Sequence, residues 1–211
     1  LTLQQQLAQQ TRLNLGQVVD LSLCKAWLND TMQDIHNRSD WYWAKDRAVV
    51  QTVIDKTAGT IALAVGGTTI TGTSTAFAAA DVGKFIQTSD SDDWYKITSV
   101  DASAQTLVIE APYTGTTELT VGTYTIRKWF YSLPSTAEKP LNIKQARSPR
   151  VITPVRFRDF DINKPNSSTT GKGENYMLWG VDSSGYIQFL IWPWADSVYN
   201  LECRFKKKFV A

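Results

Sequence analysis

Few residues of this chain have the types and spacing that enzyme catalysis requires. His36 is the only histidine, so a histidine general base or a Ser-His-Asp triad would have to use it. It falls in the C-terminal half of a predicted helix, where a surface histidine is the simpler interpretation. No Ser-His-Asp constellation stands out beyond chance. The sequence therefore predicts a protein that is not an enzyme.

Two polar loops resemble ligand sites at first sight. Ser89–Asp93 contains three aspartates and two serines, but it lacks the glycine and the distal glutamate of an EF-hand calcium loop. We interpret it as a solvated hairpin tip. Gly66-Gly67 and Thr68–Gly72 do not form a phosphate-binding loop, because the lysine that such a loop requires is absent. We expect neither a metal nor a cofactor.

The two cysteines, Cys24 and Cys203, lie near opposite ends of the chain. Neither is followed or preceded by another ligand residue at metal-site spacing. Each falls on an apolar face, which favours buried free thiols. A disulfide remains the alternative, because two cysteines alone carry little information about pairing.

Aromatic residues are abundant, with eight tryptophans, and Phe, Trp and Tyr together reach 11%. Aromatic side chains are enriched where protein surfaces bury against partners, which favours assembly, although they also fill the cores of thin β layers. Trp94, Tyr95 and Tyr113 would suit a sugar-stacking platform. Trp94 and Tyr95 are adjacent in a predicted strand and should point to opposite faces, which weighs against a carbohydrate-binding module.

The charge is nearly balanced, with 22 basic and 20 acidic side chains and a net charge of +2. Proteins that bind DNA usually carry a basic face or stripe. The nearly equal numbers of basic and acidic residues do not suggest such a face. The longest apolar runs are far shorter than the roughly 20 residues of a membrane helix.

Two clusters of basic residues stand out. We interpret Arg147, Arg150, Arg156 and Arg158 as a solvated surface and Lys206–Lys208 as a partner contact.

The elements that must position these residues begin with a helix from Asp20 to about Arg38, after a Gln-rich arm at residues 1–19. Apolar residues recur at helical spacing, and Asp20 is placed to cap the start; the apolar positions are Leu21, Cys24, Leu28, Met32 and Ile35. The aromatic triplet Trp41-Tyr42-Trp43 follows a turn. We expect at least two of its rings to pack in the core of the chain, with partner contact as the second role.

A compact β module rich in Thr, Gly and Val is expected between Gly59 and Pro134. Short strands separated by turns rich in Gly, Ser and Asp at this spacing indicate a small barrel or sandwich. The expected strands are Ile61–Val65, Thr69–Thr71, Lys84–Thr88, Trp94–Val100, Thr106–Glu110 and Thr123–Leu133. A single helical turn is expected at residues 79–83.

The remaining segments predict a β base around this module. A first strand is expected within residues 48–57. After the module come a proline-broken connector at 134–154, a short helix within 155–162 and a mobile surface loop at 163–175. The chain then ends in a hairpin of Tyr186–Trp192 and Ser197–Lys207, whose period-2 alternation is typical of an antiparallel sheet with one buried face.

The predicted fold class is α+β and mostly β. It combines an N-terminal amphipathic helix, an antiparallel β base and an inserted small β barrel or sandwich. The expected domains are residues 1–58 for the arm, helix and first strand, 59–134 for the inserted module, and 135–211 for the connector, loop and closing hairpin.

The order of these motifs resembles the head-to-tail adaptor (connector, or neck) proteins of tailed bacteriophages. The likeness starts with the helix at Leu28–Ile35 and Trp41-Tyr42-Trp43, and ends with "GYIQFLIWPWADSVYNLECRFKKK". In that family a strand closes on a proline, a Pro-x-Ala/Asp turn follows, and a basic aromatic strand ends the pattern. The matching positions here are Ile187–Pro193, Trp194-Ala195-Asp196, Tyr199, Leu201, Arg204, Phe205 and Lys206–Lys208. The central "TTITGTSTAFAAADVGKFIQ" resembles a second phage-associated pattern.

The resemblance implies a structural virion protein located in the neck, between the capsid vertex and the tail, and in the host cytoplasm during assembly. Such adaptors dock on the portal protein as a ring, here of twelve copies, extend the DNA channel and present the attachment surface for the tail or its terminator or nozzle protein. DNA would pass without sequence-specific binding, and no membrane is involved. The expected portal or partner contacts are Arg204, Lys206, Lys207, Lys208, Trp41 and Trp43.

Two alternatives stay open from the sequence. One is a tail-tube or baseplate subunit, which stacks with sixfold rather than twelvefold symmetry. The other is a carbohydrate-binding module of a virion protein, using Trp94, Tyr95 and Tyr113.

Overall fold

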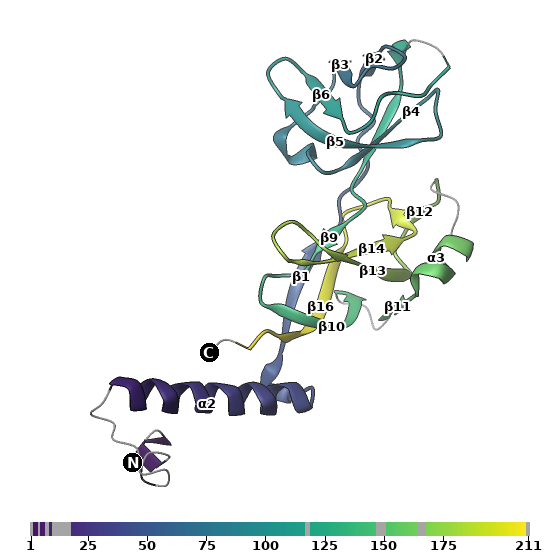
Figure 1. Ribbon diagram of the computed structural model, residues 1–211. Coiled ribbons are helices and arrows are strands. Elements are labelled where there is room, and N and C mark those ends of the chain that lie inside the picture. The colour runs from purple at the N-terminus through teal and green to yellow at the C-terminus, as the bar shows by residue number, and fades with distance from the viewer. Residues whose placement is uncertain are drawn as a thin grey trace. The chain divides into compact units, whose positions relative to one another are not determined.

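The computed structural model describes residues 18–116, 119–146, 151–163 and 168–209, together with a few of the first nine positions (Figure 1). The fold is α+β and mostly β, as the sequence predicts. The chain divides into two compact units. Unit 1 comprises Leu1–Arg47, Thr136–Leu141 and Arg204–Ala211; unit 2 comprises Ala48–Ser135 and Asn142–Cys203.

Unit 1 is built around the predicted helix, which is confirmed as α2 (Val18–Arg38). The helix begins two residues before Asp20, so Asp20 does not stand at the start as the cap that we expected. A short 3-10 turn, η1 (Tyr42–Ala44), follows and leads into β1 (Lys45–Gln51). The first strand therefore begins before the predicted 48–57 segment. The rest of unit 1 is contributed by parts of β10 (Ala137–Gln145) and β16 (Asn200–Lys207).

The base is a seven-stranded sheet with the order β1-β16-β10-β11-β13-β14-β9. Its neighbours β10/β11, β13/β14 and β14/β9 are antiparallel, and β11/β13 is a parallel pair. The antiparallel base is thus confirmed, with one parallel pair inside it. The remaining strands are β9 (Tyr131–Ser132), β11 (Val151–Pro154), β13 (Asn175–Val181) and β14 (Ile187–Trp192).

The predicted closing hairpin is wrong in its pairing. β14 lies between β13 and β9, whereas β16 lies between β1 and β10. The turn after β14 forms its own strand, β15 (Trp194–Ala195), which pairs in parallel with β12 (Thr170–Gly171) and directs the chain away from β14. The actual hairpin joins β13 to β14. Its turn is closed by Asp182 Oδ1, which accepts hydrogen bonds from the backbone N–H groups of Ser184 and Tyr186, both at 2.9 Å.

The proline-rich segment 134–154 is not the irregular connector that we expected, because it forms β10 and β11. Pro140 lies within β10 and Pro154 ends β11. Proline is compatible with a strand where its missing N–H is not needed by the ladder. The pairing of buried Ile143 with buried Ile152 supplies the apolar contact between the two strands.

The short helix predicted in residues 155–162 is confirmed as α3 (Phe157–Asn163). The predicted mobile loop at 163–175 is wrong in part, since β12 and the start of β13 lie within it. Residues 164–167 of that loop lie outside the described residues.

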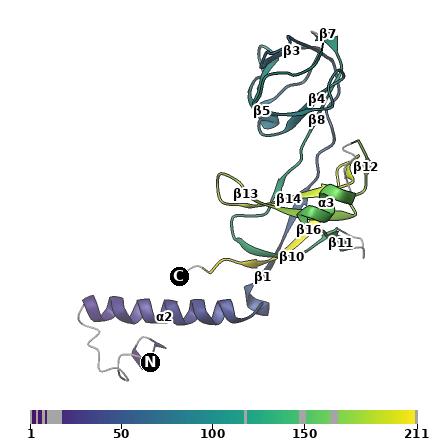
Figure 2. The same cartoon turned by 45° about the vertical axis from the view of Figure 1, so that its right-hand side comes forward.

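The inserted module forms a second seven-stranded sheet with the order β7-β2-β3-β6-β5-β4-β8. Its end strands, β7 (Leu119–Gly122) and β8 (Tyr124–Arg127), are joined by Thr123 alone, so the sheet must curl until its two edges approach. Figure 2 shows this curled sheet. The predicted small barrel is therefore confirmed. Its other strands are β2 (Thr60–Leu63), β3 (Thr69–Thr73), β4 (Phe85–Thr88), β5 (Trp94–Asp101) and β6 (Thr106–Ile109).

The barrel differs from the prediction in two places. The expected strand 123–133 is two strands, β8 and β9, which belong to different sheets, and β7 was missed. The core follows the expected period-2 pattern. The buried apolar side chains of the barrel are Ile61, Leu63, Ile70, Phe77, Ile86, Tyr95, Ile97, Leu107, Ile109, Tyr113, Tyr124 and Ile126.

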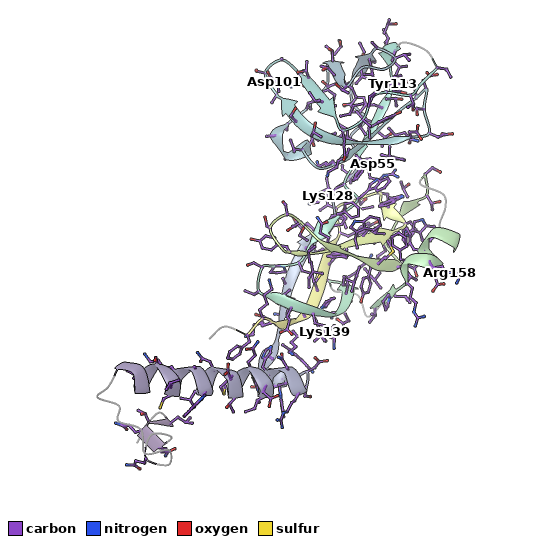
Figure 3. The ribbon with its side chains drawn as sticks, in the orientation of Figure 1. Asp55, Asp101, Tyr113, Lys128, Lys139 and Arg158 are labelled. Atoms are coloured by element: carbon purple, nitrogen blue, oxygen red, sulfur yellow. The ribbon has the colours of Figure 1, made fainter. Side chains whose placement is uncertain are left out.

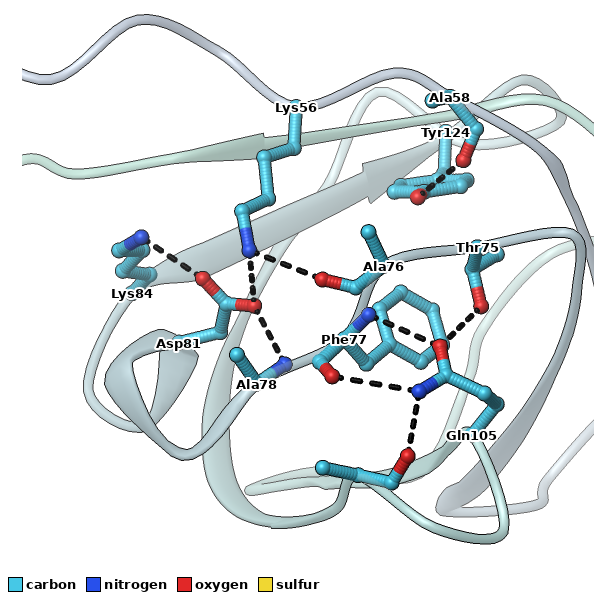
Figure 4. Close-up of polar contacts among 11 residues, drawn as sticks. Lys56, Ala58, Thr75, Ala76, Phe77, Ala78, Asp81, Lys84, Gln105 and Tyr124 are labelled. Atoms are coloured by element: carbon cyan, nitrogen blue, oxygen red, sulfur yellow. Dashed lines mark hydrogen bonds and ion pairs between the residues drawn. The ribbon is translucent and has the colours of Figure 1, made fainter.

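A buried carboxylate fixes the helical turn that we predicted at 79–83, which is η2 (Ala79–Asp81). Asp81 is fully buried; its Oδ2 accepts hydrogen bonds from Lys56 Nζ at 2.6 Å and the Ala78 N–H at 3.0 Å, and its Oδ1 accepts from Lys84 Nζ at 2.7 Å (Figure 4). Burial alone would raise the pKa of Asp81, but the hydrogen bonds from both lysines and Ala78 outweigh it and lower that pKa below its ordinary value. This network ties the segment that enters the barrel to η2.

Candidate interaction surface

The apolar residues of α2 are largely uncovered. Leu23, Trp27, Met32 and Ile35 are exposed, whereas Cys24 is the fully buried apolar side chain of the helix among its described residues. A helix that packs only within its own chain buries its apolar stripe and exposes a polar face. The predicted stripe is thus only partly covered, because Met32 and Ile35 belong to it and remain open to solvent.

The aromatic triplet after α2 is also exposed, and the expectation that two of its rings lie in the core is wrong. Trp41 is 41% exposed, Tyr42 87% and Trp43 44%. The reason is that the segment turns as η1, whose buried residue is Ala44. The Trp41 indole Nε1 donates a 2.6 Å hydrogen bond to the Ile35 carbonyl, which satisfies one of the carbonyls that a helix end leaves open.

His36 is not the surface residue that the sequence indicated. It is 2% exposed, and its Nε2 lies 3.0 Å from Glu138 Oε2. Its ring packs against Trp43 and Phe209, with ring centroids 5.5 and 5.8 Å apart. The last turn of α2 is thereby anchored to β10 and to the segment after β16. No local sequence signal could have identified this pairing, because His36 and Glu138 lie 102 positions apart.

The C-terminal basic residues divide into supporting and exposed side chains. Lys206 is buried, with its Nζ 3.6 Å from Glu138 Oε1, so its prediction as a direct partner contact is wrong. Period-2 alternation would place Lys206 on the opposite face from Phe205, but both side chains are buried at this end of β16. Lys207 is half-buried, and Arg204 and Lys208 are exposed. The Lys208 N–H donates to the Thr136 carbonyl at 2.7 Å.

These residues belong to one compact unit, and Figure 3 shows the side chains along α2. We call the exposed apolar set the α2 surface. It extends over more than one side of the helix, because Leu23 and Met32 are about 180° apart around its axis. It consists of Leu23, Trp27, Met32, Ile35, Trp41, Tyr42 and Trp43. Seven large apolar side chains exposed in one short stretch are unusual for a surface that faces only water, whereas single exposed apolar residues need no explanation.

The aromatic residues considered for sugar binding do not form an exposed platform. Tyr95 and Tyr113 are buried in the barrel core, and Trp94 is half-buried. The Tyr113 hydroxyl donates to Asp90 Oδ2 at 3.1 Å, and the Tyr95 hydroxyl lies 2.7 Å from Thr114 Oγ1. The aspartate-rich turn therefore contributes to holding the barrel's own tyrosines.

The other sequence candidates lie apart from the α2 surface. Arg156 and Arg158 are exposed, and Arg147 and Arg150 lie outside the described residues. Cys24 and Cys203 are free and buried, one in each unit. Within the described ranges, no three His, Cys, Asp or Glu side chains gather as they would around a metal ion.

Comparison with protein-family models, with curated proteins and with solved structures finds no significant match to this chain. None of the helices in the described part of the chain has the length and apolar character needed to span a lipid bilayer.

Proposed function

We propose that this chain is a structural virion subunit of a tailed bacteriophage, a head-to-tail adaptor. In this function it docks on the portal as a ring, extends the DNA channel and presents the surface to which the tail attaches. The observation that carries the proposal is the α2 surface, whose apolar side chains stay exposed in the isolated chain. The order of sequence motifs that resembles the adaptor family supports the same function.

The chemistry of the α2 surface suits contact with another protein. Burying one large apolar side chain contributes about 1.5–3 kcal/mol, so even a few of these side chains would drive association. Tryptophan and tyrosine are the residue types that most often dominate the energy of protein interfaces, and three of the seven residues are Trp27, Trp41 and Trp43. In a ring, each copy meets two neighbours through different faces, and many modest contacts add up.

Polar contacts among α2, β10 and β16 give this surface a defined shape. His36 and Lys206 both contact Glu138, so α2, β10 and the end of β16 are tied together within unit 1. Arg204 and Lys208 remain exposed at this end of the chain and would add charged contacts to an acidic partner surface. Lys206 then acts as a positioning residue, and Trp41 and Trp43 as contact residues.

The test is reconstitution with purified portal rings, followed by size-exclusion chromatography and electron microscopy. The chain should join the portal as a ring of twelvefold symmetry. Changing both Trp27→Ser and Tyr42→Ser should abolish this association, because both side chains are exposed and the changes leave the core of the chain intact. The matched control is Val121→Ser with Val198→Ser, two exposed apolar residues of unit 2, which should bind the portal normally.

Three outcomes would contradict the proposal. Docking of the Trp27→Ser, Tyr42→Ser variant as well as the unchanged chain would show that the α2 surface is not the contact with the portal. A stable sixfold tube formed by the chain alone would favour the tail-tube subunit. Specific binding on a glycan array would favour the carbohydrate-binding module.

A further inference from the structure

Unit 2 contains a cleft of about 870 Å³ that the proposed function does not use. Its walls come from β1, from η2 and the segment that leads into β4, from β5, from β9 and the segment before it, and from the β13–β14 hairpin. Ligand pockets for small molecules are typically about 300–1,000 Å³. The cleft therefore has room for a compound of the size of a nucleotide.

The cleft gathers three lysines: Lys84, Lys96 and Lys128. Lys96 is exposed and Lys128 half-buried, and neither forms an ion pair with any of the described residues. Lys84 pairs with Asp81, but that carboxylate is shared with Lys56. The positive charges of these lysines outnumber the negative charges of the carboxylates near them. The cleft should therefore attract an anion.

Among the described residues the cleft has one acidic lining residue, Asp182, and its oxygens accept hydrogen bonds within the protein. Asp182 Oδ1 accepts from the N–H groups of Ser184 and Tyr186, and Oδ2 accepts from the Ser132 hydroxyl at 3.0 Å. These hydrogen bonds, the one from Tyr186 first, lower the pKa of Asp182. Three lysines against one carboxylate leave the lining positive.

Lys128 lies near enough to Lys84 for the charge of Lys84 to affect the pKa of Lys128. Lys128 lies in the segment between β8 and β9 (Figure 3), with its Nζ 5.1 Å from the centre of the Tyr131 ring. Burial, and then the nearby ammonium group of Lys84, lower the pKa of Lys128. A bound anion would relieve both effects, since it replaces lost solvation and offsets the repulsion between the two lysines.

The cleft wall also contains the aromatic residues Phe85, Trp129, Phe130 and Trp179. Trp129 stacks on Phe85 with ring centroids 4.3 Å apart, and on Trp194 at 5.5 Å. Trp179, which is 48% exposed, packs on Phe130 at 5.1 Å. Such rings give an apolar wall of fixed orientation beside the lysines. Aromatic walls next to cationic side chains suit ligands that combine a flat ring with a phosphate.

An unused hydrogen-bond donor adds to this picture. Trp129 lines the cleft, and its buried indole Nε1 has no acceptor among the described residues. Buried tryptophan N–H groups usually have a hydrogen-bond partner. A ligand with ring nitrogens, carbonyl groups or phosphate oxygens would bring an acceptor to this wall.

The geometry points to a binding site for a nucleotide, with the phosphate at Lys84, Lys96 and Lys128 and the base against the aromatic wall. The nucleotide is either free or a unit of a single-stranded nucleic acid, since both present the same phosphate and ring. This inference concerns unit 2 only and stands independently of the α2 surface.

The test is a titration of the full chain with AMP, adenosine, inorganic phosphate and a short oligothymidylate, followed by tryptophan fluorescence and calorimetry. AMP should bind saturably, and adenosine should bind about tenfold or more weakly, because it lacks the charge-assisted contacts. Binding of AMP without preference for the oligonucleotide indicates a free nucleotide. Markedly tighter binding of the oligothymidylate indicates single-stranded nucleic acid.

Lysine variants distinguish binding in the cleft from nonspecific electrostatic binding of anions to the protein surface. Lys96→Gln should weaken AMP binding about tenfold without affecting folding, because Lys96 is exposed. Lys128→Gln should weaken it at least as much, with circular dichroism to verify the fold. Lys172→Gln, at an exposed lysine of unit 2 outside the cleft, should bind like the unchanged chain. Absence of binding by both AMP and the oligothymidylate, or equal affinity of the Lys96 and Lys172 variants, overturns the inference.

Discussion

His36 Nε2 lies 3.0 Å from Glu138 Oε2, and the second oxygen of the same carboxylate lies 3.6 Å from Lys206 Nζ. Glu138 is thus the common partner of a buried histidine on α2 and a buried lysine on β16. One partly exposed carboxylate, 38% exposed, holds the three segments of unit 1 together.

Glu138→Ala should loosen unit 1 without unfolding the barrel. The change leaves buried His36 and Lys206 without their partner, and an unsatisfied buried polar group costs about 1–3 kcal/mol. Hydrogen exchange should accelerate in the last turn of α2 and at residues 204–209. Glu110→Ala, at an exposed position that follows β6, is the control and should leave this exchange unchanged. Equal exchange in both variants would show that Glu138 does not hold α2.

Asp81→Asn should destabilise the barrel by about 2 kcal/mol at neutral pH. This is less than the roughly 3–5 kcal/mol lost when a fully buried ion pair is broken, because Lys56 is partly exposed to solvent. The pKa of Asp81 is lowered in the folded chain, so its stabilisation is present above the ordinary value of 3.8 and is lost as the pH falls through the lowered value. Chemical denaturation of both proteins should therefore differ at neutral pH and converge in acid.

The control for this change is Asp92→Asn, since Asp92 is exposed. It should unfold like the unchanged chain at every pH. If the difference in unfolding free energy between Asp81→Asn and the unchanged chain stays constant down to strongly acidic pH, the ion pairs of Asp81 with Lys56 and Lys84 are not its source.

Arg127→Gln should destabilise unit 2 by about 3 kcal/mol, because Arg127 is buried and its loss leaves Asp55 without its charge partner. Arg127 Nε donates to both oxygens of Asp55, at 3.0 and 3.1 Å, and Nη2 donates to Oδ2 at 2.6 Å. The guanidinium also lies 4.9 Å from the Trp94 ring centre and 5.3 Å from that of Trp194. Thermal unfolding and the near-ultraviolet circular dichroism of the tryptophans should both change.

Arg158→Gln serves as the comparison for this variant, because Arg158 is exposed on α3. Its melting temperature should stay within the error of the unchanged chain. If the two arginine variants melt alike, the Arg127–Asp55 pair does not stabilise unit 2.

Cys203 should resist thiol reagents while the chain is folded. Burial, and then the nearby Glu202 carboxylate, raise the pKa of Cys203 to about 12. At pH 8 only about one thiol in ten thousand would be the reactive thiolate, and Cys24 is also fully buried. A chromogenic disulfide reagent should label neither cysteine in buffer and both in denaturant. A Ser99→Cys variant, exposed on β5, should react at once; rapid native labelling of the unchanged chain would contradict the burial.

Much of the local structure could be predicted from the sequence. The spacing of Leu21, Cys24 and Leu28 predicts α2, and the alternation around Ile86 and Ile97 predicts strands of the barrel. These signals are reliable because helix and strand periodicities depend on residues a few positions apart. Pro140 and Pro154 misled the prediction, since proline argues against a strand unless its N–H has no partner in the ladder.

The candidate surface was predictable in its residue types but not in their exposure. Trp41 and Trp43 were expected to serve partner contact only as a second role, and Lys206 was expected to contact a partner. In the structure both tryptophans are exposed, and Lys206 is buried and contacts Glu138. Exposure depends on which distant segment packs against a side chain, and no short sequence window contains that information.

The sequence by itself determined the helix α2, the strand-rich barrel and its apolar core, because backbone propensity and hydrophobic periodicity act between near neighbours along the chain. Only the tertiary structure decided that β14 pairs with β13 and β9 rather than with β16, that His36 and Lys206 share Glu138, and that Lys84, Lys96 and Lys128 line one cleft. Those relationships join residues far apart in sequence, and the free energy that selects them comes from hydrogen bonds and packing that exist only once the whole chain has folded.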